Sequence, residues 1–175
     1  MTRFHILKAT KQKITDKKIF GFDIETYDNN KKFYCSSIYG DDPAHCKTFF
    51  SKDDAIKYFK KERIFRNSIV SATNLQFDFF GLFHDKPDET KFRMLWRGSQ
   101  MLYAESYFKG GEFISHAERE KNSQRHKFTF IDTGNYTPLS VKQLGNIIGL
   151  PKLKTPSFIG AVSYTHLTLP TILLV

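Results

Sequence analysis

The sequence contains only two cysteines, Cys35 and Cys46, among its 175 residues, which is too few for a disulfide framework. It also lacks any apolar run that approaches the length of about 18 residues needed to span a membrane. Residues 1–13 lack the continuous apolar segment of a secretion signal. We therefore expect a protein of a reducing, cytoplasmic compartment that has no membrane partner.

Acidic residues are outnumbered, with 27 Lys and Arg against 18 Asp and Glu, so the formal net charge is +9. This excess favours a polyanionic partner, first of all nucleic acid, and we expect single-stranded DNA binding to weaken steeply with salt. The basic residues gather in 8–18, 57–61 and 152–154, although each cluster by itself is more typical of a solvated surface. The 18 phenylalanines fit core packing, base stacking or both.

Charged residues are absent after Lys154, although the chain's charged fraction predicts about five in the 21 residues that follow. Within this stretch, VSYTHLTLPT at 162–171 resembles a sequencing adapter that has been read through in translation. The alternative is a genuine hydrophobic last strand, since Tyr, Thr, Ile and Val suit a sheet. We favour the artefact, and predict a domain at 1–161 followed by an artefactual tail at 162–175. His166 is therefore not counted as a catalytic candidate.

Apolar alternation and turn residues predict a meander of strands, followed by strands that alternate with helices. The expected strands are 18–26, 31–39, 45–50, 68–72, a pair within 91–108 turned at Gly98 and Ser99, and 127–132. The expected helices are one capped by Ser51, a turn or two at 76–84, and one capped by Ser140 and ended by Gly149 and Pro151. This order is typical of a mixed α/β sheet of the ribonuclease H-like type, flanked by helices, although many folds share so coarse an order.

Two carboxylates, Asp23 and Glu25, stand two residues apart in the first predicted strand, in the string FDIET. Side chains at i and i+2 of a strand project from the same face, so these acids point together. Their mutual repulsion is costly unless a cation lies between them, and hard ions such as Mg²⁺ take oxygen ligands of this kind. The alternative for this common pattern is an exposed acidic strand end.

A second polar group follows the strand 68–72, where Asn74 ends the strand and Asp78 lies in the next helical turn. Ligands of open α/β sheets gather where strands end and helices begin, so Asp78 is placed to share a metal with Asp23 and Glu25. The structural alternative makes Asn74 a helix N-cap and Asp78 a first-turn carboxylate that offsets the helix dipole.

The strings GFDIET and NLQFDFFGL resemble the first and second motifs of the DEDD superfamily of 3′→5′ exonucleases. The form N-L-x-F-D is most similar to the proofreading domain of protein-primed family B DNA polymerases of phages, viruses and linear plasmids. The string FIDTGNYTPLSVKQLGNIIGLPK resembles a further stretch of that family, so the resemblance covers about residues 20–154. It implies a monomeric nuclease region of a DNA polymerase, in the host cytoplasm, with a single-stranded primer 3′ end and a terminal protein primer as partners.

The resemblance also implies roles for individual residues. Asp23 would bridge two Mg²⁺ or Mn²⁺ ions, with Glu25 and Asp78 completing their coordination for hydrolysis of the phosphodiester. Candidates for holding the single-stranded 3′ end are Thr26, Asn74, Phe77, Thr133 and Lys154. For Phe77, whose ring could stack on any base, core packing is the competing interpretation.

The family's third motif, a Tyr or His with a last Asp, has no match in this sequence. Asp132 is the last aspartate, lacks a Tyr or His at the right preceding spacing, and belongs to a strand end. We therefore expect the 175-residue polypeptide to have little or no exonuclease activity, which efficient Mg²⁺-dependent degradation of a single-stranded primer would contradict. Two alternatives stay open: a stand-alone DEDD exonuclease that has lost its last third, and a non-catalytic nucleic-acid-binding module of the same fold.

Overall fold

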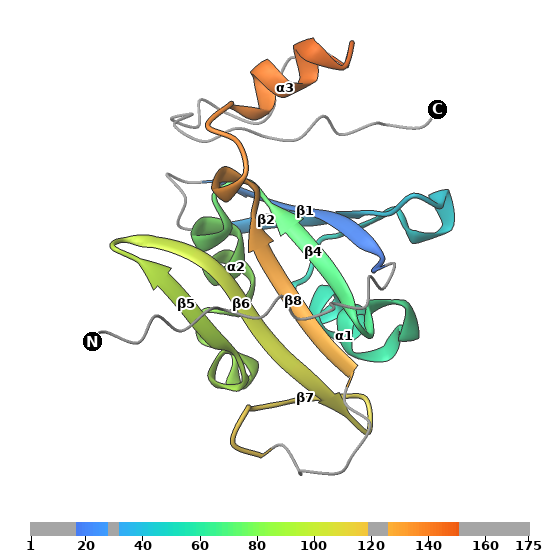
Figure 1. Ribbon diagram of the computed structural model, residues 1–175. Coiled ribbons are helices and arrows are strands. Elements are labelled where there is room, and N and C mark those ends of the chain that lie inside the picture. Colours follow the sequence, from blue (N-terminus) through green and yellow to red (C-terminus); the bar gives the residue numbers. More distant parts are fainter. Residues whose placement is uncertain (1–16, 28–31, 119–125, 151–175) are drawn as a thin grey trace, which may run out of the picture.

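The computed structural model describes residues 17–27, 32–118 and 126–150, which build one mixed sheet with helices (Figure 1). The strands are β1 (Ile19–Tyr27), β2 (Lys32–Tyr39), β3 (Lys47–Phe49), β4 (Ser68–Ala72), β5 (Arg93–Arg97), β6 (Gln100–Lys109), β7 (Glu112–Ile114) and β8 (His126–Asp132). The α-helices are α1 (Lys52–Lys61), α2 (Leu75–Phe83) and α3 (Val141–Ile147). Short 3₁₀ turns are η1 (Pro43–His45), η2 (Arg63–Phe65), η3 (Pro87–Lys91) and η4 (Thr133–Asn135).

The eight strands lie in the order β3-β2-β1-β4-β8-β6-β5, and β7 pairs with β6. The central strands β1, β4 and β8 run parallel, whereas β2, β3, β6 and β5 join antiparallel on either side. Parallel neighbours that are not consecutive in the chain need crossover connections, which α1 and α2 supply. The expected ribonuclease H-like mixed sheet, flanked by helices, is confirmed.

The core lies between the sheet and the helices α1 and α2, and it is built mainly of phenylalanine. Phe22 and Ile24 of β1 alternate with half-buried residues and face this core. The fully buried rings are Phe20, Phe22, Phe59, Phe65, Phe79, Phe83, Phe128 and Phe130. Neighbouring rings meet edge-on or tilted, as with Phe59 and Phe65 at 4.9 Å and 67°. Most of the phenylalanines therefore pack in the core.

Helix starts agree closely with the sequence prediction because their caps are local. The Ser51 hydroxyl accepts from the Asp54 N–H at 3.4 Å. At α3, the Ser140 hydroxyl accepts from the Gln143 N–H at 3.3 Å, while Gln143 Oε1 accepts from the Ser140 N–H at 2.8 Å. This reciprocal pair is a capping box.

Two strands differ from the prediction, whereas α2 (Leu75–Phe83) agrees with the helical segment expected at 76–84 to within one residue. The third strand begins only at Lys47, since the Asp42 carboxylate accepts from the Ala44 N–H and starts the turn η1. Strand β7 is not among the predicted strands, and it follows a turn at Gly110 and Gly111, whose φ angles of 62° and 86° suit glycine.

Some predictions fall outside the described residues, among them the tail at 162–175, Lys154 and the lysines of 8–16. Within the described ranges, no helix is long and apolar enough to cross a membrane.

Candidate active site

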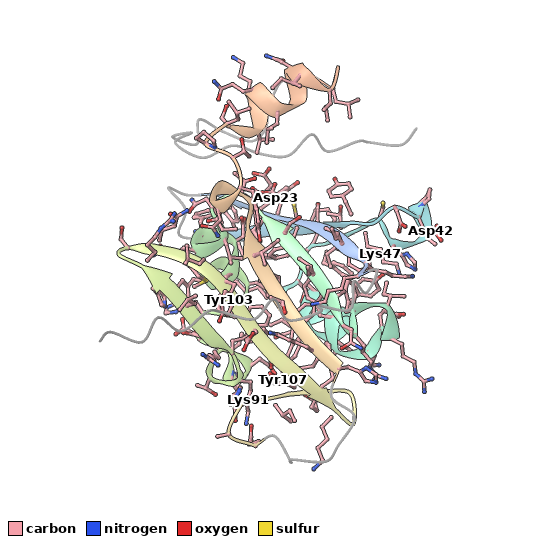
Figure 2. All side chains as sticks on the ribbon, in the orientation of Figure 1. Asp23, Asp42, Lys47, Lys91, Tyr103 and Tyr107 are labelled. Atoms are coloured by element: carbon pink, nitrogen blue, oxygen red, sulfur yellow. The ribbon has the colours of Figure 1, made fainter. Side chains whose placement is uncertain are left out.

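The two predicted acids of β1 lie on one face of a central strand. Asp23 and Glu25 are half-buried and alternate with the buried Phe22 and Ile24, so they project from the side of the sheet opposite the core. In Figure 2 Asp23 lies at the end of the sheet toward α3, far from Lys91 and Tyr107 at the opposite end.

Asp78 reaches β1 because β1 and β4 separate toward their carboxyl ends. Their parallel pairing covers Ile19–Gly21 and ends there. Beyond it, the backbone N–H of Ile24 donates to Asp78 Oδ1 at 3.1 Å instead of to a strand partner. The first turn of α2 thus supplies a carboxylate to the backbone between the two acids of β1, and Asp78 is only 1% exposed.

Electrostatics connect these carboxyl groups. Burial raises the pKa of Asp78 well above its ordinary value, and the Asp23 charge raises it further. The Ile24 N–H opposes this shift, while Glu25 and Asp132 add to it. Burial and the neighbouring negative charges thus both disfavour the ionised form of Asp78, and a cation at this place would offset them.

One oxygen of Asp78 fits a cation. Among the described residues Asp78 Oδ2 is buried and has no hydrogen-bond partner, whereas buried polar atoms are ordinarily paired. Carboxylate oxygens are the ligands that Mg²⁺ prefers. Within residues 17–27, 32–118 and 126–150, no three His, Cys, Asp or Glu side chains are close enough to hold an ion between them. The orphaned oxygen is thus the feature that fits a metal, and the ligand set stays a prediction.

Asp132 is a neighbour of this site that the sequence did not assign to it. It ends β8 and is buried, with Oδ2 accepting from the Leu75 N–H at 3.2 Å and Oδ1 from the Gly134 N–H at 2.7 Å. These bonds hold the first turn of α2 against the end of β8. Since β8 runs parallel to β4, its carboxyl end reaches the same edge of the sheet, and that topology is the signal that could have found it.

The predicted strand-binding residues lie around the same edge. Asn74 adopts a left-handed conformation, with φ 64° and ψ 56°, and its side chain makes no capping bond. Asn74 occupies the N-cap position of α2, as the structural alternative predicts. The Asp132 carboxylate, and not the Asn74 side chain, accepts from the N–H of Leu75, the first residue of the helix. The Thr133 hydroxyl bonds the Thr73 hydroxyl at 2.8 Å, which places it where β4 and β8 end.

Phe77 and Thr26 complete this edge. Phe77 is half-buried and does not belong to the core cluster of the described residues. Thr26 follows Glu25 on β1, where a bulge shifts the register with β2. The structure places Asp78 near enough to Asp23 and Glu25 for their charges to interact, while the metal-binding role of these acids and the DNA-binding roles of their neighbours stay predictions.

Cys35 lies beside the acids and gives a testable consequence. It is opposite Glu25 in the β1–β2 ladder, and burial, Glu25 and Asp23 together raise the pKa of its thiol to about 11. Because the thiolate is the reacting species, we expect iodoacetamide at about pH 8 to react with Cys35 about 100-fold more slowly than with an ordinary thiol. Peptide mapping of the treated chain, with the partly exposed Cys46 as internal reference, measures this. Equal labelling of both cysteines would contradict the placement of Cys35.

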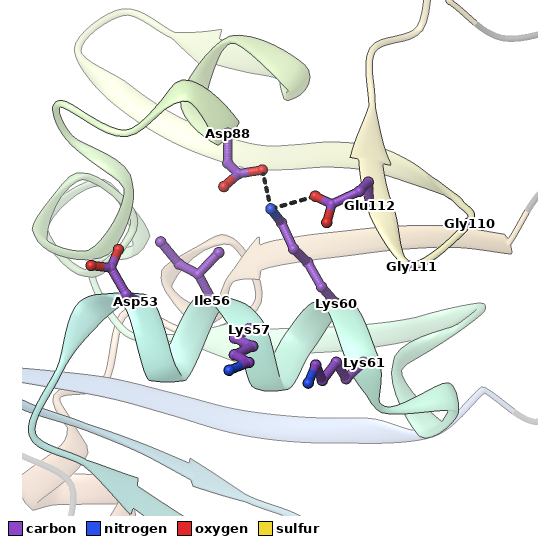
Figure 3. Close-up of a pocket in the computed structure, with 9 residues that line it drawn as sticks. All are labelled: Asp53, Ile56, Lys57, Lys60, Lys61, Asp88, Gly110, Gly111 and Glu112. Carbon is purple, nitrogen blue, oxygen red and sulfur yellow. Dashed lines mark ion pairs between the residues drawn. The ribbon is translucent and has the colours of Figure 1, made fainter.

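A hollow of about 410 Å³ lies between α1, η3 and the turn into β7 (Figure 3). Lys60 crosses it, with Nζ 2.9 Å from Asp88 Oδ1 and 2.6 Å from Glu112 Oε2. Burial lowers the pKa of Lys60, but the hydrogen bonds that its ammonium group donates to these two carboxylates outweigh this effect and leave a raised pKa. Part of the basic cluster at 57–61 is therefore neutralised within the fold.

Solved structures of a DNA polymerase contain a similar fold. A crystal structure of Phi29 DNA polymerase matches 84% of the chain, at 15% sequence identity and a TM-score of 0.58. Its complex with single-stranded DNA matches 83% at 14% identity and a TM-score of 0.59. A ternary complex with primer-template DNA and incoming nucleotides matches 86% at 12% identity and a TM-score of 0.59. At this level of sequence identity, the structural similarity establishes a shared fold.

The chain spans only about a quarter of the length of these polymerases, between 26% and 28%. No protein-family model and no curated protein sequence matches the chain. The structural similarity therefore covers one region of these polymerases and shows a shared fold.

Proposed function

We propose that the chain is the proofreading 3′→5′ exonuclease region of a DNA-directed DNA polymerase of family B, of the protein-primed type. The observation that carries the proposal is Asp78, a buried carboxyl with one orphaned oxygen, which is electrostatically coupled to Asp23 and Glu25. Perturbed carboxyls gathered at the carboxyl ends of parallel strands are typical of catalytic sites.

Asp23, Glu25 and Asp78 would hold two Mg²⁺ or Mn²⁺ ions, with Asp78 contributing Oδ2. Such ions, when bound, activate water and stabilise the leaving oxygen of a phosphodiester. The chain's own contribution is orientation. The Ile24 N–H fixes Asp78 Oδ1, and Asp132 fixes the first turn of α2 that carries Asp78.

The substrate would be the single-stranded 3′ end of DNA. Thr26, Asn74, Phe77 and Thr133 lie around the acids, and Phe77 has the partly exposed ring that sequence-independent stacking requires. The solved complexes of Phi29 DNA polymerase with single-stranded DNA and with primer-template DNA support this class of substrate.

The test measures hydrolysis of DNA by the protein expressed from the uninterrupted reading frame. The variant with both Asp23 and Asp78 replaced by Ala is the comparison. Shortening of a 5′-labelled single strand from its 3′ end, lost in the double variant, is expected. A stand-alone exonuclease would give the same result without primer extension. A non-catalytic binding module would retain the DNA and leave it intact.

A further inference from the structure

Three exposed aromatic rings lie side by side on β1, β2 and the residue after β3, and we call them the aromatic face. Tyr27, Tyr34 and Phe50 are 43%, 38% and 70% exposed. The rings of Tyr27 and Tyr34 are 6.5 Å apart at 86°, and those of Tyr34 and Phe50 are 5.8 Å apart at 81°. A row of exposed rings contributed by three strands is unusual at the surface of a monomer, where such patches mark interaction sites.

The aromatic face continues the face that carries the acids. Tyr27 stands two residues after Glu25 and four after Asp23, so strand alternation places all three on the same side of β1. In the ladder Glu25 pairs with Cys35 and Thr26 with Phe33, which leaves Tyr34 as the extra residue of a β-bulge. Bulges re-aim side chains and often lie beside active sites.

Phe50 lies on the same side of the sheet as Tyr34 because its neighbour Phe49 packs against the core. Phe49 packs against the ring of Tyr58 at 5.1 Å, on the side of α1. The next residue of an extended chain points the other way, so Phe50 turns toward Tyr34. These three strands form one edge of the sheet (Figure 1).

A cation borders these rings, since Lys32 Nζ lies 5.7 Å from the centre of the Tyr27 ring. Aromatic rings beside an ammonium group complement single-stranded nucleic acid, whose bases stack on rings and whose phosphates attract cations. The net charge of +9 favours the same partner.

We propose that the aromatic face binds the single strand a few nucleotides away from the 3′ end. This placement rests on the proposed function, which puts the 3′ end at Asp23, Glu25 and Asp78. Tyr34 and Phe50 stack on successive bases, and Lys32 lies beside a phosphate. An exonuclease must hold a strand of any sequence while its end is removed, and stacking on aromatic rings does not depend on the base sequence.

The test measures binding of fluorescein-labelled oligo(dT) to the 175-residue chain by anisotropy, in EDTA so that hydrolysis cannot contribute. We expect Phe50→Ala and Tyr34→Ala each to weaken binding about 5- to 100-fold, the range for loss of one base–aromatic stack. Phe50→Trp retains a stacking ring and is expected to bind as the wild type does. Leu95→Ala, which trims an exposed side chain on β5, is the control and leaves the affinity unchanged.

Equal affinity of the wild type and both alanine variants would overturn the proposal, as would absence of binding by the wild type. Self-association that Phe50→Ala abolishes, with unchanged DNA affinity, would assign the face to a second copy of the chain instead. Thermal unfolding of each variant verifies that it is folded. Failure of the proposed function can be told apart from failure of this proposal. The former appears as absent hydrolysis by the protein expressed from the uninterrupted reading frame, whereas the latter appears in this binding assay.

Discussion

Substitution of Asp78 by Asn is expected to raise the melting temperature of the 175-residue chain at neutral pH in EDTA. The Asn carboxamide oxygen can still accept from the Ile24 N–H, while its NH₂ replaces the orphaned Oδ2. That group donates toward Asp23, Glu25 and Asp132, so the repulsion that raises the pKa of Asp78 becomes attraction. Each kcal/mol gained raises the melting temperature of a chain of this size by about 2–4 °C.

The pH dependence follows from the direction of the Asp78 shift, since its pKa is raised in the folded state. Unfolded, the carboxyl ionises near its ordinary pKa of about 3.9, so above that pH the folded state binds more protons than the unfolded state. Asp78 therefore costs stability progressively as the pH rises from about 4 through its raised folded pKa. The advantage of Asp78→Asn should vanish below about pH 4, as thermal unfolding across the pH range would reveal.

Two comparisons sharpen this experiment. Asp132→Asn is the matched control, because both oxygens of Asp132 accept backbone N–H groups and Asn loses one acceptor, at a cost of about 1–3 kcal/mol. Mn²⁺ should stabilise the wild type and have a smaller effect on Asp78→Asn. A lower melting temperature for Asp78→Asn at pH 7, without metal, would contradict the assigned environment of Asp78.

The largest effect on activity is expected from the double substitution of Asp23 and Asp78 by Ala in the uninterrupted reading frame. Removing two proposed metal ligands should lower the rate of 3′-nucleotide removal by about 1,000-fold or more, since bound metals supply several kcal/mol of transition-state stabilisation. Denaturing gels of a 5′-labelled single strand, with Mg²⁺, measure the rate. Binding of the strand in EDTA should change little, because stacking and phosphate contacts remain.

Asp85→Asn is the control for this pair. Asp85 is exposed and adopts a φ of 63°, which Asn tolerates as well as Asp does, so folding and hydrolysis should both be unchanged. Unchanged hydrolysis in the double variant would show that these acids are not the site. Loss of hydrolysis together with DNA binding and a collapsed melting temperature would indicate a folding defect instead.

Local features were predictable from the sequence because local forces decide them. The caps at Ser51 and Ser140 depend on hydrogen bonds to residues three positions away. The strand of Asp23 and Glu25 follows from alternation of period two, which also sets the side of the strand that each acid faces. The order of these elements along the chain predicted a ribonuclease H-like sheet, and the sheet topology confirms this prediction.

The sequence by itself thus determined most of the elements and the shared side of β1 from which Asp23 and Glu25 project. Only the tertiary structure decided which phenylalanines enter the core and which stay at the surface, as Phe79 and Phe50 illustrate. It also decided that β1 separates from β4, that Asp132 joins the acids and that a bulge exposes Tyr34. Each of these depends on register and packing between segments distant in the chain, where neither periodicity nor a local hydrogen bond carries information.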